Sequence, residues 1–130
     1  MTPPALTEED LNRVVDAFYA RVRMDDVLGP IFNNAIHDWP GHLVTLRAFW
    51  SSVMLTTGRY KGQPMVAHAR HATDMTPAAF ERWLMLWRET TDALLPVDAA
   101  AAMQEKAARI AESLMLGVDF YRNRALGLSG

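Results

Sequence analysis

Cysteine is absent from the chain of 130 residues, which excludes disulfides, thiolate metal sites and cysteine nucleophiles. No uninterrupted apolar run is long enough to span a bilayer, so the sequence predicts no membrane helix. An excess of basic charge is also missing. The net charge is −2 with both signs mixed along the chain, which argues against nucleic acid or an anionic membrane as a partner. The acidic start carries no basic region followed by an apolar run, so no secretory signal is expected and a cytoplasmic location is predicted.

Strand patterns are missing as well, whereas helical periodicity runs through almost every segment. Half of the residues are hydrophobic, which is enough to bury a core. The length suits one compact domain, and no linker divides the chain, so residues 1–130 are expected to form a single domain. The predicted fold class is all-α.

The first expected helix begins at Thr7, which together with Asp10 forms a capping-box pattern. Its apolar stripe has the spacing of a buried helix face and consists of Leu11, Val14, Val15, Phe18 and Val22. The following "DDVLGPIFNNAI" is expected to break the helical pattern at Gly29 and Pro30. The acidic residues nearby are read as solvated or capping charges: Glu8, Glu9, Asp25 and Asp26.

Three further long helices follow from their end signals. Asp38 is the expected cap of a helix that runs to about residue 57 and stops at Gly58. Thr76 is the expected cap of the next, which Pro96 ends, and Asp98 is the expected cap of the last. The inward face of the last helix is predicted to consist of Met103, Ala107, Ile110, Leu114 and Tyr121.

Polar side chains interrupt three of these apolar stripes. Tyr19 lies among core positions of the first helix, and Trp83 lies between two inward aromatic residues. His42 heads a stripe that continues through Leu46, Phe49 and Val53. Taken singly, each is most simply a core residue whose polar tip is hydrogen-bonded. Taken together, they suggest several hydrogen-bond donors that converge on one apolar cavity.

Two histidines, His68 and His71, lie three residues apart after the loop "GRYKGQP". A zinc site would need a third ligand such as Asp74 or His42, and the chain has no HExxH motif. Haem needs only one strong axial histidine, an apolar slot and a few polar edge contacts. Isolated inward histidines on two helices fit haem better than zinc, although composition does not decide between them.

Several motifs in order resemble the truncated haemoglobins, and most closely their third group. They are "FYARVRMDDVLGPIF", "WPGHLVTLRAFWSSVMLTTGRYKGQP", "AHARH" and "FERWLMLW", which together cover roughly residues 11–87. The combination is specific, although any single piece would be weak. The resemblance implies a shortened globin fold, a two-over-two helical sandwich around haem b. It also implies a small diatomic ligand such as oxygen.

The resemblance assigns roles residue by residue. His68 matches the proximal ligand of the haem iron, while Tyr19, His42 and Trp83 match the distal residues that face the bound ligand. Phe32, Leu46 and Phe49 match positions that contact the haem. In a helix a three-residue step turns the side chain by about 300°. His71 is therefore expected at the haem edge or in solvent.

The haem carboxylates need cationic or hydroxyl partners. Candidates by position are Arg59, Tyr60, Arg70 and His71, each of which could equally face water. Tyr60 is the preferred candidate.

Three functions follow as hypotheses. The first is reversible binding of oxygen or another diatomic ligand, for which Tyr19 and Trp83 can donate hydrogen bonds. The second is a redox enzyme that oxidises nitric oxide or uses peroxide. It would depend on an external reductase because the chain has no room for a flavin or nicotinamide domain. The third is a haem-free interaction domain. A monomer or weak oligomer is expected.

Overall fold

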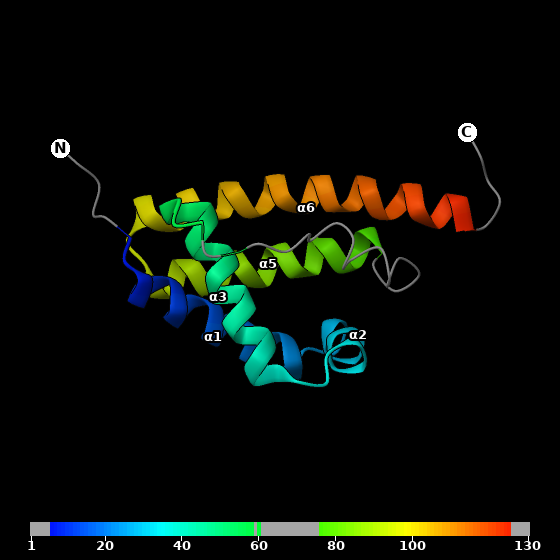
Figure 1. The fold of residues 1–130 in the computed structure, drawn as a ribbon, viewed down its shortest axis with the longest axis horizontal. Coiled ribbons are helices and arrows are strands. Elements are labelled where there is room, and N and C mark those ends of the chain that lie inside the picture. The colour runs from blue at the N-terminus through cyan, green and yellow to red at the C-terminus, as the bar shows by residue number, and fades with distance from the viewer. Residues whose placement is uncertain (1–5, 59, 61–75, 126–130) are drawn as a thin grey trace.

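The computed structural model describes residues 6–58, 60 and 76–125, with side chains as far as residue 117. All regular elements among these residues are helices, which confirms the predicted all-α class. They are α1 (Glu8–Met24), α2 (Leu28–Ala35), α3 (Trp39–Leu55), α5 (Pro77–Leu94) and α6 (Val97–Ala125) (Figure 1).

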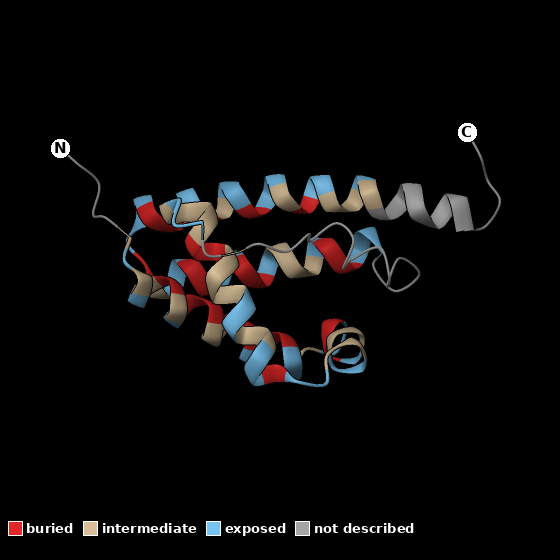
Figure 2. Ribbon diagram, viewed as in Figure 1, coloured by how far each residue is buried: buried red, intermediate tan, exposed pale blue. Residues whose placement is uncertain are grey.

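Helix α1 lies centrally in the fold and packs against α2, α3 and α5. Helix α3 crosses α1, while α5 and α6 run side by side (Figure 1). Buried residues lie on the faces that these helices turn toward one another, and exposed residues lie on the opposite faces (Figure 2). No helix in the described part of the chain is long and apolar enough to cross a membrane.

The start and the buried face of α1 confirm the sequence pattern. The Asp10 backbone N–H donates to Thr7 Oγ1 at 3.1 Å, and the Thr7 backbone N–H donates to Asp10 Oδ2 at 3.2 Å. The predicted stripe is completely buried. Each such apolar side chain contributes about 1.5–3 kcal/mol relative to exposure, so this face anchors the core.

Helix α2 corrects the expected break at Gly29 and Pro30, because both residues lie in its first turn. Proline fits there because the first N–H groups of a helix have no partner within the helix. The Asp25 carboxylate accepts hydrogen bonds from two backbone N–H groups at the helix start, at 2.9 and 3.0 Å. Gly29 is needed for packing, since a Cβ there would lie 2.9 Å from the Arg23 carbonyl oxygen.

Helices α3 and α5 begin at the N-caps that the sequence predicts. The Asp38 side chain accepts from the Gly41 backbone N–H at 3.1 Å, and Thr76 accepts from Ala79 at 3.2 Å. Helix α3 ends with Thr56 in the left-handed conformation, at a φ of 54°. This is about where the sequence predicted the end.

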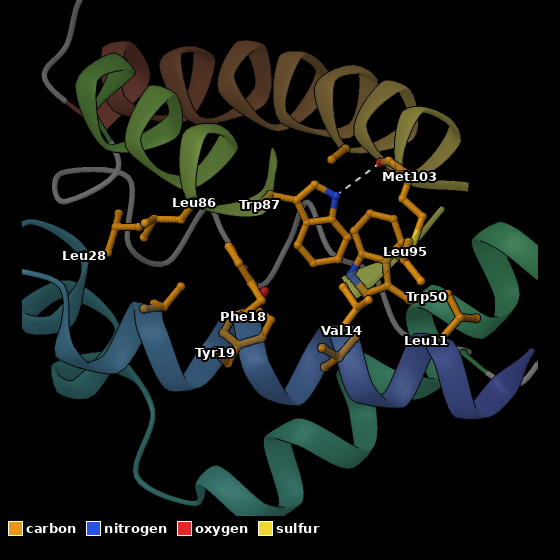
Figure 3. Close-up of a cluster of buried hydrophobic side chains, with 14 of the residues drawn as sticks. Leu11, Val14, Phe18, Tyr19, Leu28, Trp50, Leu86, Trp87, Leu95 and Met103 are labelled. Carbon is orange, nitrogen blue, oxygen red and sulfur yellow. Dashed lines mark hydrogen bonds between the residues drawn. The ribbon is translucent and has the colours of Figure 1, made fainter. Parts of the chain in front are cut away.

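Helix α6 begins at Val97, so Asp98 lies within its first turn and is not its cap. Small buried residues, among them Ala100 and Ala107, line its face toward α5. The Trp87 indole N–H donates to the Met103 carbonyl at 3.2 Å and joins the two helices (Figure 3). Met103 and Ala107 are buried as predicted and Ile110 and Leu114 half-buried, while the Tyr121 side chain lies outside the described residues.

Candidate functional site

Tyr19 lies at the centre of an aromatic cluster formed by α1, α2 and α3. It is 4% exposed and lies beside Phe18 on α1, with ring centroids 4.7 Å apart (Figure 3). Its ring centroid is 6.2 Å from those of Phe32 and Trp39, and 6.5 Å from that of His42. The phenol is therefore surrounded by rings that the linear sequence does not place together.

The Tyr19 hydroxyl lies close enough to Trp83 for that side chain to affect its pKa. Burial raises the pKa of Tyr19 well above its ordinary value, and the hydrogen bond from Trp83 lowers that pKa in part. Because an indole N–H can only donate, the Tyr19 oxygen is the acceptor. Tyr19 therefore stays protonated at neutral pH and keeps its own O–H as a donor.

The Trp83 ring is fixed by core side chains on two sides. It stacks on Trp87 at 5.7 Å with an angle of 2° between the planes, and it meets Phe18 nearly perpendicularly at 5.3 Å. Trp87 in turn stacks on Trp50 of α3 at 4.5 Å. The position of the Trp83 N–H is thus set by a column of indoles.

His42 lies in the first turns of α3 and is half-buried. Its imidazole meets Tyr19 at 6.5 Å and Trp39 at 5.8 Å, nearly perpendicular to each. The three rings form a triangle in which Tyr19 and Trp39 are 6.2 Å apart. His42, Tyr19 and Trp83 come from three helices and share this one region.

An ion pair joins the corner between α1 and α2 to the helix that carries Trp83. Arg82 donates to Asp25 Oδ1 from Nη2 at 2.6 Å and from Nε at 2.9 Å. The Asp25 side chain is only 4% exposed, and the hydrogen bond from Arg82 holds the pKa of that carboxyl below its ordinary value. The reading of Asp25 as a capping charge is confirmed, whereas the alternative that it is solvated is wrong.

The residues expected to contact haem surround the same region as partly buried apolar side chains. Phe32, Leu46 and Phe49 all pack against the core without being fully covered. Tyr60 meets Phe49 nearly perpendicularly at 5.2 Å, and its backbone N–H donates to Ser52 Oγ at 2.8 Å. Burial raises the pKa of Tyr60. Tyr60 is therefore held against α3 beside Phe49.

The remaining assigned residues are His68, His71, Arg59 and Arg70, and they lie outside the described residues. Their roles stay predictions. The sequence reasoning missed Trp39, although its position three residues before His42 places both on one side of α3.

The described side chains fit a haem by their chemistry. A porphyrin is a flat apolar body, and partly covered aromatic and aliphatic side chains from α2 and α3 offer apolar contacts to it. The Tyr19 hydroxyl, the Trp83 N–H and the His42 imidazole supply the few polar groups of such a site.

Two comparisons agree with this arrangement, while no model of a known protein family matches the sequence. The group 3 truncated hemoglobin of Campylobacter jejuni is 33% identical over 113 residues, which cover 82% of this chain and 86% of that protein. The crystal structure of a group III truncated hemoglobin from Campylobacter jejuni superimposes with a TM-score of 0.78 and 31% identity. The superimposed region covers 91% of this chain and 95% of the chain in that crystal structure.

The fold and the comparisons define a shortened globin with its helices packed two over two. Within that class, the chain belongs to the group III truncated haemoglobins, which makes it a globin-like haem protein.

Proposed function

We propose that the protein binds oxygen or another small diatomic ligand at the iron of haem b. His68 is the axial ligand in this proposal, and Tyr19, His42 and Trp83 form the opposite, distal side. The observation that carries it is the buried Tyr19 hydroxyl, whose pKa is raised by burial so that it keeps a proton to donate, with Trp83 beside it.

When bound, the haem supplies an iron with an open coordination position for a diatomic ligand. The chain supplies the proton donors beside that position. Donation from Trp83 into the Tyr19 oxygen polarises the Tyr19 O–H, which makes it a stronger donor. A negatively polarised ligand such as oxygen gains most from such a donor where little water competes. These bonds favour slow ligand release, which suits retention better than bulk transport.

The axial histidine has its own task in the proposal. His68 would hold the iron through a ring nitrogen, and an acceptor for its other ring nitrogen would fix the orientation of the imidazole. Phe32, Leu46 and Phe49 give apolar contacts to the porphyrin. Tyr60 would hold the haem carboxylates, with Arg59, Arg70 and His71 as further candidates.

Absorption spectra of the ferric, ferrous and carbonyl forms test the proposal directly. His68→Ala should abolish the spectrum of a histidine-ligated haem, whereas His71→Ala should retain it. Equal loss of haem from both variants would contradict the axial assignment, because only one of the two histidines can carry the bond to iron.

A further inference from the structure

Trp39 is the first residue of α3 and belongs to the aromatic cluster around Tyr19. It is 7% exposed, and it contacts both Tyr19 and His42. Nothing in the proposed function uses this ring. Its position raises the question of what it does to His42.

Two contacts, and a hydrogen bond that supports one of them, fix the orientation of the Trp39 ring. Its indole N–H donates to Asn33 Oδ1 at 3.2 Å, and Asn33 Nδ2 donates to the Arg23 carbonyl at 3.0 Å. The Arg23 guanidinium lies over the ring at 4.7 Å from its centroid. Because an indole has a single N–H, its bond to Asn33 selects one orientation of the ring.

His42 fits between this fixed ring and Tyr19. The imidazole is nearly perpendicular to both, with centroids 5.8 Å from Trp39 and 6.5 Å from Tyr19. A change of rotamer at χ1 turns a side chain by about 120°. Any such turn of His42 breaks its contact with at least one of the two rings.

We infer that Trp39 is a positioning residue for His42: it holds the imidazole against Tyr19 and so sets how often His42 turns outward. The inference rests on the proposed function, in which His42 belongs to the distal side, and it adds that an inward His42 obstructs the entry of a ligand. Asn33 and Arg23 hold the Trp39 ring and therefore affect the position of His42 indirectly. In this way α1 and α2 influence access to the distal side.

Carbon monoxide binding to the haem-loaded protein tests this inference. Flash photolysis gives the rate of rebinding, and the infrared C–O stretching bands report the polar groups beside the ligand. Trp39→Leu removes one aromatic contact of His42 and should shift the ratio of inward to outward positions by about two- to tenfold. Rebinding should accelerate by a similar factor, and the relative areas of the C–O bands should change.

The effect of Trp39→Leu must depend on His42. In a His42→Leu background, Trp39→Leu should change neither the rate nor the bands further. Independent, additive effects of the two substitutions would overturn the inference, because a structural residue would act whether or not His42 is present. Trp39→Phe keeps a ring but loses the N–H, and Asn33→Ala removes its acceptor. Both should shift rate and bands in the same direction, and they carry the test if Trp39→Leu does not fold.

Asn34→Ala is the matched control, because Asn34 is the exposed neighbour of Asn33 on α2 and should leave rate and bands as they are. Failure of the inference can be told from failure of the gate itself. If His42→Leu changes the rate but the Trp39 and Asn33 variants do not, the positioning role is wrong. If His42→Leu changes neither rate nor bands, His42 does not obstruct entry and the inference is wrong, while the proposed function still stands or falls on the haem spectra.

Discussion

In the proposed distal site Tyr19 and Trp83 are unequal donors, and this inequality can be measured. Trp83 lowers the pKa of Tyr19 in part, and its N–H can act toward the Tyr19 oxygen only as a donor, whereas the Tyr19 O–H keeps its proton for another acceptor. Tyr19→Phe therefore removes the direct donor to a ligand. Trp83→Phe removes only the group that strengthens that donor.

The expected magnitudes differ accordingly. A hydrogen bond to a partly charged ligand is worth about 1.5–3 kcal/mol, so Tyr19→Phe should speed oxygen release by about ten- to a hundredfold. Cooperative strengthening amounts to about 10–30% of a bond. Trp83→Phe should therefore speed oxygen release by no more than about fivefold.

The assay is displacement of oxygen by excess carbon monoxide in a stopped-flow instrument. Carbon monoxide carries less charge when bound, so its own release should change less in both variants. Trp87→Phe is the matched control, because it removes an indole N–H from the same helix that donates to the Met103 carbonyl. Because phenylalanine keeps a ring stacked against Trp83, this substitution should reduce stability and leave oxygen release nearly unchanged, whereas loss of the ring altogether would not be a control. Faster release in Trp83→Phe than in Tyr19→Phe would refute the assignment of Tyr19 as the direct donor.

Two further predictions concern the corner between α1 and α2. Arg82 holds the pKa of Asp25 below its ordinary value of 3.8, so the charged carboxylate stabilises the fold above about pH 4, and this contribution is lost as the pH falls through the lowered value. Asp25→Asn keeps a capping side chain but removes the charge. Urea unfolding should show that the variant has a lower free energy of unfolding than the original protein, and that this difference shrinks toward low pH. A difference that does not change with pH would contradict the role of the charge. Gly29→Ala places a methyl group against the Arg23 carbonyl and should lower the free energy of unfolding by about 1–3 kcal/mol. The exposed Asn34→Ala should change it by less than about 0.5 kcal/mol, and equal values for the two variants would mean that the backbone relaxes at Gly29.

Local signals predicted most of the helices because their causes lie within a few residues. The capping box at Thr7, the cap at Asp38 and the proline after Thr76 each act on the neighbouring turn of backbone. Helix α2 was missed because Gly29 and Pro30 resemble breakers. Gly29 is suitable because the Arg23 carbonyl approaches it closely, which a sequence pattern does not reveal, and Pro30 is suitable because it lies in the first turn.

The candidate site could be predicted only as a set of residue types. The stripes indicated that Tyr19 and Trp83 turn inward, but the bond between them depends on how α1 packs against α5. The partner of Asp25 lies 57 residues along the chain, at Arg82, beyond any local pattern. The contact of Trp39 with His42 could have been predicted, because a tryptophan one helical turn before an inward histidine lies on the same side of the helix.

The stacked indoles of Trp83, Trp87 and Trp50 connect the proposed ligand site to α3 through the core. Trp83 cannot tilt without sliding over Trp87, and Trp87 is held in turn by Trp50 and by the Met103 carbonyl. The orientational entropy of the Trp83 donor is therefore lost during folding, and none of it remains to be lost when a ligand arrives. Removal of the whole ring at Trp50, in contrast to a substitution such as Trp87→Phe that keeps a ring in place, should consequently loosen the Trp83 donor, although no atom that would touch the ligand has changed.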